Sequence, residues 1–444
     1  MAQGETSSAL SQAPPLALGL RLNLSLLMFL EFAVWGSWYV VFYPYLKGKG
    51  FSDEQAGALF GNFALGAIFS SLFAGYIADR FFASERMMAV LHLVGAGLLY
   101  WMAQIQNPDD YWLLFGVSLA YCLLYNPTLT LANAITFRHI PDGTRDFPVI
   151  RVFGTLGWIA VGFLIDLLFA SGGGTAVDTN GPLLLAAGLS AFLGLYCLVL
   201  PHTPPTARTG DAIPFLKAVG LFKDFSFAVF FSVSFIITIV LAFYFTSTSD
   251  FLKEAAGVKR IGSTMLIGQV GELIFLPLLP LFLWRLGMKW VLALGMLSWG
   301  IRYALFSVGG PKGLPFALVI AGVALHGFCF DFFFAAGFIY VDNEAPRDIR
   351  ASGQALFSFL AYGVGSWLGS LLAGKLMAVY AGDWYHFWLV PCIGVLISLT
   401  VFVLFFRIQR RTPGSRTYEE RSGSDVYSAE HQARIQSGEA GIDV

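Results

Sequence analysis

The chain has 444 residues, of which 57 % are hydrophobic and only 12 % are charged, and its mean hydropathy is +0.68. It has too few polar side chains to cover a soluble surface, so its composition excludes a soluble enzyme and indicates a polytopic membrane protein. The formal net charge of −1 offers no basic surface to a nucleic-acid partner.

Twelve apolar segments follow one another along the chain, each close to the roughly 20 residues that span a bilayer as an α-helix. They are continuously apolar and lack the alternating pattern of a membrane β-barrel. We therefore expect an all-α polytopic membrane protein with twelve transmembrane helices. The expected spans are residues 22–46, 54–78, 86–105, 111–136, 147–170, 182–201, 225–249, 261–284, 289–309, 315–341, 350–380 and 385–407.

Lys and Arg residues are shared unevenly between the loops on the two sides of these spans. Loops on the side of the N-terminus carry many of them, including Arg80, Arg86 and Arg138, whereas the opposite loops carry few, such as Lys47 and Lys253. Cytoplasmic loops are enriched in these residues. We therefore expect a multi-pass protein of a cell membrane, the inner membrane of a bacterium, with both termini in the cytoplasm.

A polar stretch with three prolines, His202 to Asp224, divides the spans into six and six. A faint internal repeat supports this division, because Arg145-Asp146 and Arg347-Asp348 occupy corresponding loops of the two halves. We expect five regions: a disordered cytoplasmic N-terminus (1–20), an N-terminal six-helix bundle (21–201), a cytoplasmic linker (202–224), a C-terminal six-helix bundle (225–407) and a disordered cytoplasmic tail (408–444).

The end of the second span contains Gly75, followed by Asp79 and Arg80 and then by the basic residue Arg86. This order resembles the loop signature of the major facilitator superfamily. The resemblance implies a gating loop, in which Gly75 lets two helices approach closely and Asp79 and Arg80 hold one gate closed. Ordinary positive-inside charge is the alternative explanation.

Polar side chains within the spans of the second half are the main candidates for a site. Asp331 lies inside the apolar stretch 315–346, where a carboxylate is unfavourable by a few kcal/mol unless it faces a cavity, a partner or a proton. Gln269 and Glu272 are three residues apart in the eighth span and so share one helical face. We therefore expect these residues to take part in function.

The first half contributes a second group of polar and aromatic residues. Arg151, Thr155 and Trp158 have spacings of four and three, which place them on one face of the fifth span. The alternative for Arg151 is an anchor at the helix end, because Arg side chains readily extend to an interface. Glu31 in the first span and Asn133 in the fourth are further candidates.

The remaining polar residues have plainer interpretations. We expect His92 and His326 to be hydrogen-bonded structural residues, and Arg302 is long enough to extend from its span to an interface. Four cysteines without metal-ligand spacing are expected to be small buried side chains: Cys122, Cys197, Cys329 and Cys392.

Several motifs occur together in a fixed order of spans. They are Trp35-Gly36-Ser37-Trp38, Pro127-Thr128-Leu129 with Asn133, Asp146-Phe147-Pro148 followed by Ile150-Arg151 and Gly154-Thr155, Gln269 with Glu272, and Phe330-Asp331-Phe332-Phe333. Together they resemble the nucleoside:proton symporter family of the major facilitator superfamily over about residues 22–407. The resemblance implies the major facilitator fold, two pseudo-symmetric six-helix bundles around a central cavity, and nucleoside uptake by proton symport through alternating access.

The resemblance also implies roles for individual residues. The expected substrate-binding residues are Asn133, Arg151, Thr155, Trp158, Gln269, Glu272, Phe330, Asp331 and Phe334, and the expected proton-coupling residues are Asp331, Glu272 and Glu31. The expected partners are a nucleoside, protons and the lipid bilayer, with no cofactor, no metal and no nucleic acid. We expect the protein to act as a monomer.

The chain departs from the family pattern at three positions. Val240 and Phe243 stand where the family carries amide side chains, and Glu31 stands where the family carries Gln. A transporter for another hydroxylated solute, such as a sugar or small metabolite, is therefore one alternative. A membrane enzyme that uses Glu272 and Asp331 as acid and base is another, although the sequence has neither an HExxH nor a Gly-x-Ser-x-Gly motif.

Overall fold

The computed structural model describes residues 15–81, 83–169, 176–205, 214–310, 313–345 and 350–407. These residues form helices and connecting loops, without a strand among them. The tail predicted for residues 408–444 and most of the predicted N-terminal segment lie outside the described residues. The first helix begins at Leu18, three residues before the predicted start of the N-terminal bundle.

The first half of the chain forms six long helices and two short 3₁₀ turns. They are α1 (Leu18–Gly48), α2 (Asp53–Phe81), α3 (Ser84–Gln104), η1 (Pro108–Asp110), α4 (Tyr111–His139), α5 (Gly143–Phe169), η3 (Ala176–Asp178) and α6 (Gly181–Cys197). The predicted linker contains the 3₁₀ helix η4 (Pro214–Lys223).

The second half is more broken. Its elements are α7 (Phe225–Glu254), α8 (Ile261–Ser307), α9 (Gly313–Ala324), α10 (His326–Phe330), the π-helix η5 (Asp331–Ala335), α11 (Ala336–Glu344), α12 (Arg350–Ser358), the π-helix η7 (Phe359–Gly365), α13 (Ser366–Tyr380) and α14 (Trp384–Phe405).

Local chemistry explains several helix ends. The Asp224 carboxylate accepts a hydrogen bond from the Phe227 backbone N–H at 2.9 Å and caps the start of α7. Asp383 caps α14 in the same way. Gly287 lies inside α8 with a φ of 74°, a conformation that favours glycine and that divides α8 into two helices.

Eight helices of the described chain are long and apolar enough to cross a membrane, and the bent pair Pro315–Ala324 and His326–Glu344 makes a ninth. This number counts α8 once and leaves out both α2 and α6, the second of which has 17 residues. Each of the twelve predicted spans nevertheless overlaps a helix of the structure. An all-helical, multi-pass membrane protein is thus confirmed, while the exact number of twelve spans stays a prediction.

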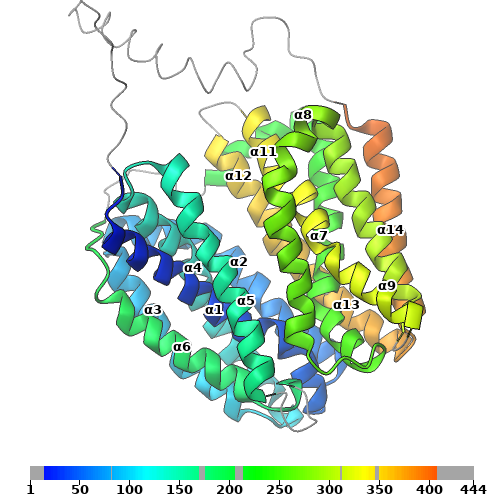
Figure 1. Cartoon of the computed structure of the whole chain (residues 1–444), viewed down its shortest axis with the longest axis horizontal. Helices are drawn as coiled ribbons and strands as arrows, with labels where there is room; N and C mark the ends of the chain where they lie inside the picture. Colours follow the sequence, from blue (N-terminus) through cyan, green and yellow to red (C-terminus); the bar gives the residue numbers. More distant parts are fainter. Residues whose placement is uncertain are drawn as a thin grey trace, which may run out of the picture.

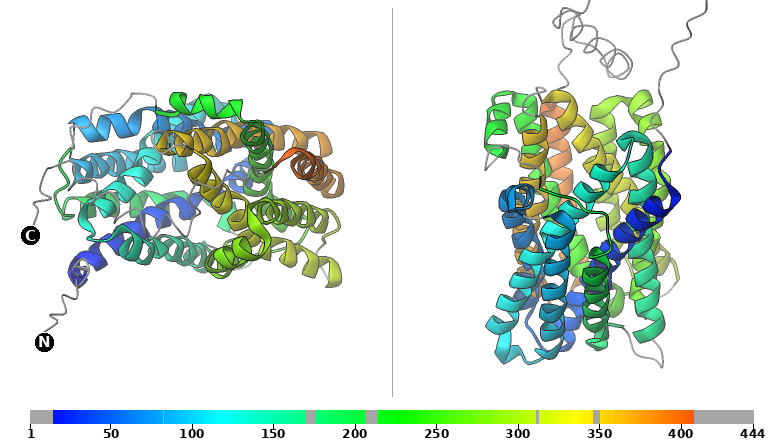
Figure 2. Two further views of the ribbon diagram at one scale, coloured as in Figure 1. Left: turned by 90° about the horizontal axis from the view of Figure 1, so that it is seen from above. Right: turned by 90° about the vertical axis from the view of Figure 1, so that its left-hand side faces the viewer.

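The helices form two bundles that lie side by side, α1–α6 in blue to green and α7–α14 in green to orange (Figure 1). Seen from above and from the side, most helices of both bundles run in roughly the same direction (Figure 2). The bundles meet where α2 packs on α13, α5 on α8 and α1 on α7. Glycines allow this approach, because a Cβ on Gly57 would lie only 2.7 Å from the Ser370 carbonyl oxygen.

Polar contacts between the bundles lie at the end where α1, α5 and α7 finish and α8 begins. The Asp166 carboxylate accepts a hydrogen bond from the Ser263 backbone N–H at 2.7 Å. The Ser249 hydroxyl donates to the Val40 carbonyl at 2.6 Å, and Lys253 pairs with Asp178 at 2.8 Å. The two bundles are therefore held together at this end.

Candidate functional site

A cavity of about 370 Å³ lies between the two bundles. Both bundles contribute to its wall, through α1, α2, α4 and α5 on one side and α7, α8, α10, η7 and α13 on the other. Its lining residues are Phe32, Trp35, Tyr39, Phe63, Ala67, Asn126, Leu129, Arg151, Thr155, Trp158, Leu241, Phe245, Gln269, Glu272, His326, Phe330, Tyr362 and Ser366. A cavity of this size can hold a small organic solute.

Aromatic rings form one part of the cavity wall. The Trp35 ring stacks on Phe63 with centroids 4.8 Å apart and meets Trp158 edge to face at 5.1 Å. The Tyr39 ring reaches across to Phe245 of the other bundle, at 5.8 Å. Rings held by such contacts present flat apolar faces with a defined orientation.

Polar groups form the other part of the wall. Arg151 places its guanidinium 4.1 Å from the centroid of the Phe32 ring, and it is attracted electrostatically to Glu272 in the opposite bundle. Gln269 lies one helical turn from Glu272 on α8. The cavity therefore has a cation on one bundle and an anion on the other.

Two polar atoms of the cavity wall are buried without a hydrogen-bond partner among the described residues. They are the indole Nε1 of Trp35 and the amide Oε1 of Gln269. Buried polar groups are normally hydrogen-bonded, and an unpaired one is destabilising by about 1–3 kcal/mol. Both atoms are covered by neighbouring groups, so a solute that accepts from Trp35 and donates to Gln269 can pair with them only after these side chains shift.

This geometry suits a solute with one flat apolar part and one hydroxyl-rich part. The rings can cover the flat part, and Arg151, Gln269 and Glu272 can exchange hydrogen bonds with the hydroxyls. The two bundles around the cavity approach each other closely at glycines such as Gly57 and Gly262, and a site between two bundles allows one bundle to rock against the other.

The model of the family described as Nucleoside H+ symporter matches residues 18–411, which is most of the chain. The chain belongs to the nucleoside H+ symporter family. Its motifs already showed this resemblance, and the match confirms it.

Named relatives and solved structures agree with the family assignment. The putative nucleoside transporter YegT of Escherichia coli is 38 % identical, over 87 % of this chain and 93 % of that protein. The xanthosine permease of Escherichia coli is 30 % identical, over 88 % and 96 %. A crystal structure of an aspartate-to-alanine variant of the nucleoside transporter NupG superposes with a TM-score of 0.81, at 30 % identity, covering 87 % of this chain and all of that one.

Membership of the nucleoside H+ symporter family confirms the major facilitator fold and the function of a proton-coupled nucleoside transporter. The alternative of a membrane enzyme is wrong, because the family and its relatives are transporters.

The structure brings together six of the nine residues expected to bind substrate. Arg151, Thr155 and Trp158 line the cavity from α5, and Gln269, Glu272 and Phe330 line it from α8 and α10. The alternative in which Arg151 anchors a helix end is wrong for this structure, because α5 already begins at Gly143 and Arg151 points into the cavity.

The other three expected residues are not part of the cavity wall. Asp331 directly follows Phe330 but is itself buried, and its Oδ2 atom has no hydrogen-bond partner among the described residues. Phe334 packs behind the wall, with its ring 5.3 Å from Phe330 and 5.5 Å from Tyr362. Asn133 lies on α4 beyond the lining residues Asn126 and Leu129.

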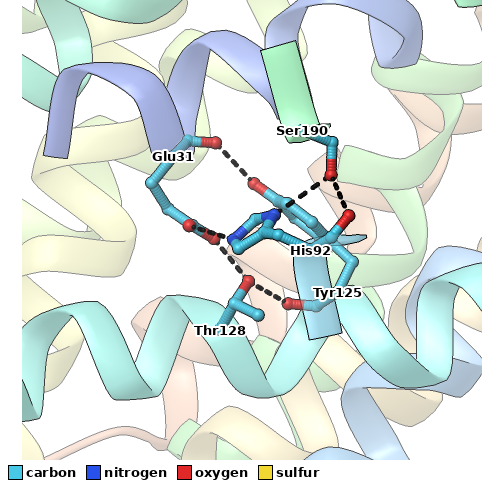
Figure 3. Close-up of polar contacts among 5 residues, drawn as sticks. All are labelled: Glu31, His92, Tyr125, Thr128 and Ser190. Carbon is cyan, nitrogen blue, oxygen red and sulfur yellow. Dashed lines mark hydrogen bonds and ion pairs between the residues drawn. The ribbon is translucent and has the colours of Figure 1, made fainter. Parts of the chain in front are cut away.

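Glu31 is fully buried inside the first bundle and does not line the cavity (Figure 3). Its Oε2 lies 2.9 Å from Nε2 of His92, and its Oε1 lies 2.6 Å from the Thr128 hydroxyl. The Tyr125 hydroxyl donates to the Glu31 carbonyl at 2.8 Å, and the far side of the His92 ring contacts Ser190. The expected structural role of His92 is consistent with these contacts.

Other expectations have mixed outcomes. The surroundings of the predicted gating residues Gly75, Asp79 and Arg80 lie outside the described part of the structure, although their backbone belongs to α2. Arg302 does not reach an interface, because it is completely buried among other side chains. Its guanidinium contacts Gly322 on α9 and His326 on α10.

Sequence reasoning missed several lining residues. Phe32, Tyr39 and Phe63 could have been found only from a three-dimensional arrangement, because each is one of many aromatic residues in its span. The cavity wall on α7 is made by Leu241 and Phe245, not by Val240 and Phe243. Since α7 contains neither Asn nor Gln, this wall lacks amide side chains whichever α7 residues correspond to the amide positions of the family.

Proposed function

We propose that this nucleoside H+ symporter binds its nucleoside in the cavity between the two bundles. The observation that carries this proposal is that Arg151 and Glu272 enter one cavity from opposite bundles, beside a cluster of aromatic rings. A nucleoside held there contacts both bundles at once, so its binding can be coupled to their relative movement.

In this proposal the base lies against the aromatic wall. Trp35, Trp158 and Phe330 supply the faces, and stacking of a base on an aromatic ring contributes about 1–3 kcal/mol. After a side-chain shift that uncovers it, the unpaired indole N–H of Trp35 can donate to a carbonyl or ring nitrogen of the base.

The ribose lies against the polar wall. Its hydroxyls can donate to the carboxylate of Glu272 and to the unpaired Oε1 of Gln269, and Arg151 and Thr155 can donate from the opposite bundle. Because a hydrogen bond to a charged group contributes about 1.5–3 kcal/mol, Glu272 and Arg151 are the groups on which affinity depends most.

Of the three carboxylates predicted to couple the proton, we favour Asp331. It is buried, one of its oxygens has no donor, and it lies near enough to Glu272 for their charges to repel. A proton on Asp331 removes this buried negative charge. Glu272 then remains free to hold the nucleoside, and the sealed Glu31 remains a structural residue.

The bundles are joined by Asp166, Ser249 and Lys253 at the end where α1 finishes. The uneven distribution of Lys and Arg supports the proposal that this end faces outside the cell. We propose that this arrangement is a state closed on the outer side. We also propose that the protein acts as a monomer in a cell membrane, with both termini in the cytoplasm.

Equilibrium binding to the purified protein tests the proposal. Labelled uridine and adenosine are expected to bind, and unlabelled nucleosides are expected to compete where free ribose does not. Gln269→Leu should weaken binding about tenfold, as expected for one lost hydrogen bond, whereas Gln106→Leu at an exposed position should not.

Two results would contradict the proposal. If the folded wild type binds free ribose or another sugar in preference to nucleosides, the apolar wall on α7 has changed the substrate. If Gln269→Leu and Gln106→Leu bind nucleosides equally well, the binding site lies elsewhere.

A further inference from the structure

The segment that carries Phe330 and Asp331 is broken just before the cavity. Helix α9 ends at Ala324, α10 begins at His326, and the two parts of the span are bent by 42°. A bend interrupts the backbone ladder, so carbonyl groups of the last turn need donors from elsewhere.

Arg302 of α8 supplies these donors. Its Nε donates to the Gly322 carbonyl at 2.9 Å, and its Nη2 lies 3.5 Å from the Val323 carbonyl. Its guanidinium lies 4.1 Å from the centroid of the Tyr244 ring and 4.7 Å from that of Trp299. The guanidinium therefore fixes the broken end of α9.

Arg302 carries a charge that is completely buried. Among the residues that the structure describes, no carboxylate forms a direct ion pair with it. An isolated charge is strongly unfavourable in the interior, so a negative group reached through another side chain is needed to balance it.

His326 makes that connection. Its Nδ1 lies 3.2 Å from Nη1 of Arg302, and its Nε2 lies 3.1 Å from Oε1 of Glu272. A guanidinium can only donate, so Nδ1 must accept and cannot carry a proton. The ring is therefore neutral with its proton on Nε2, and it donates to the Glu272 carboxylate.

Close packing between α8 and α10 holds this chain of hydrogen bonds in place. A Cβ on Gly268 would lie 2.7 Å from Cβ of His326, and a Cβ on Gly271 would lie 3.0 Å from the Ala324 carbonyl oxygen. Larger residues at these two glycines would push His326 away from Glu272. The His326 ring also stacks on Tyr244, with centroids 4.8 Å apart.

We propose that Arg302 and His326 are positioning residues that keep Glu272 ionised and aimed into the cavity. The proposal rests on the proposed role of Glu272 in holding the nucleoside. A proton on Glu272 would remove the anion that balances Arg302, so the chain of hydrogen bonds directs the coupling proton away from Glu272. Arg302 does not touch the cavity and acts through His326.

Other groups also face Glu272, and the test must separate their effects. Arg151 of α5 attracts it, Asp331 of η5 repels it, and the hydroxyls of Tyr244 on α7 and Tyr362 in η7 interact with it electrostatically. Within the described structure none of them donates a hydrogen bond to the carboxylate, so His326 is the donor to remove.

The test compares His326→Leu with His326→Gln. A Gln amide can accept from Arg302 through its oxygen and donate to Glu272 through its nitrogen, whereas Leu can do neither. The measurement is the Kd for uridine of each purified variant between about pH 5 and about pH 8, the range in which histidine titrates.

Lowering the pH across this range should weaken uridine binding to His326→Leu about tenfold more than it weakens binding to the wild type. The reason is that Glu272 becomes protonated in the variant. For His326→Gln we expect the wild-type pH profile. In a Glu272→Gln background, His326→Leu should no longer alter the profile. Arg302→Lys should shift the profile in the direction of His326→Leu, whereas Arg285→Lys at an exposed position should not.

Equal pH profiles for His326→Leu and His326→Gln would overturn the proposal and leave Arg302 as a support for the helix bend alone. A shift that persists in the Glu272→Gln background would overturn it as well. These outcomes differ from failure of the proposed binding site, in which Glu272→Gln alone binds uridine as tightly as the wild type.

Discussion

Replacing Glu31 by Gln or by Leu distinguishes a structural role from a proton-coupling role. The Ser190 hydroxyl donates to the His92 carbonyl at 2.9 Å, so its oxygen is left to accept from Nδ1 of His92, 3.2 Å away. Nδ1 therefore carries a proton. The 2.9 Å contact between Nε2 of His92 and Oε2 of Glu31 then needs one further proton, held by either atom.

The hydrogen-bond count predicts different results for the two variants. In Glu31→Gln the amide N–H takes the place of the shared proton, and the amide oxygen can still accept from Thr128. The free energy of unfolding should change by less than about 1 kcal/mol. Glu31→Leu has a similar volume but leaves Nε2 of His92 buried without a partner, and should be destabilising by about 1–3 kcal/mol.

Thermal unfolding in detergent and gradient-driven uptake into proteoliposomes measure the two effects. Glu31→Gln should unfold near the wild-type temperature and keep proton-driven uptake, while Glu31→Leu should unfold at a lower temperature. Glu54→Gln and Glu54→Leu, at an exposed position, serve as matched controls. Equal destabilisation by Gln and Leu would refute the hydrogen-bond count. A stable Glu31→Gln protein without gradient-driven uptake would make Glu31 the proton carrier.

Three further changes test the cavity and the closed end. Trp158→Ala should raise the Kd for nucleosides by roughly 5- to 150-fold through lost stacking. Equal effects of Trp158→Ala and of Trp112→Ala at an exposed position would contradict this expectation. Gly57→Val should slow uptake, because its Cβ would meet the Ser370 carbonyl at 2.7 Å and keep the bundles apart; wild-type uptake would show that the contact is dispensable. Asp166→Ala removes the acceptor for backbone N–H groups at the start of α8. It should lower the free energy of unfolding, measured by thermal denaturation, by about 0.5–2 kcal/mol. An unchanged unfolding transition would show that water replaces this cap.

The arrangement of spans was predictable because continuous apolar segments depend only on local sequence. The same holds for Arg151, Thr155 and Trp158, whose helical spacing places them on one face whatever surrounds the helix. The break inside α8 at Gly287 falls between the predicted eighth and ninth spans, so these two spans were also separated correctly.

Contacts between distant segments decided what the sequence alone left open. His92 is 61 residues from Glu31, and nothing local to either residue indicates that they are partners. The sequence suggested that Arg302 extends to an interface. It is instead held inside the protein by backbone carbonyls that are free to accept hydrogen bonds only because α9 ends there. Asp331 was correctly expected to be buried in an apolar span. Only the structure shows that its Oδ2 atom has no hydrogen-bond donor among the described residues.

The most direct test of proton-coupled nucleoside transport through this cavity is uptake of labelled uridine and adenosine into proteoliposomes, with and without an inward proton gradient. Wild type, Asp331→Asn and the exposed control Asp110→Asn are compared. We expect the gradient to drive uptake by the wild type and by Asp110→Asn but not by Asp331→Asn, which should still bind nucleosides. Gradient-driven uptake by Asp331→Asn at the wild-type level would contradict the assignment of the coupling proton to Asp331.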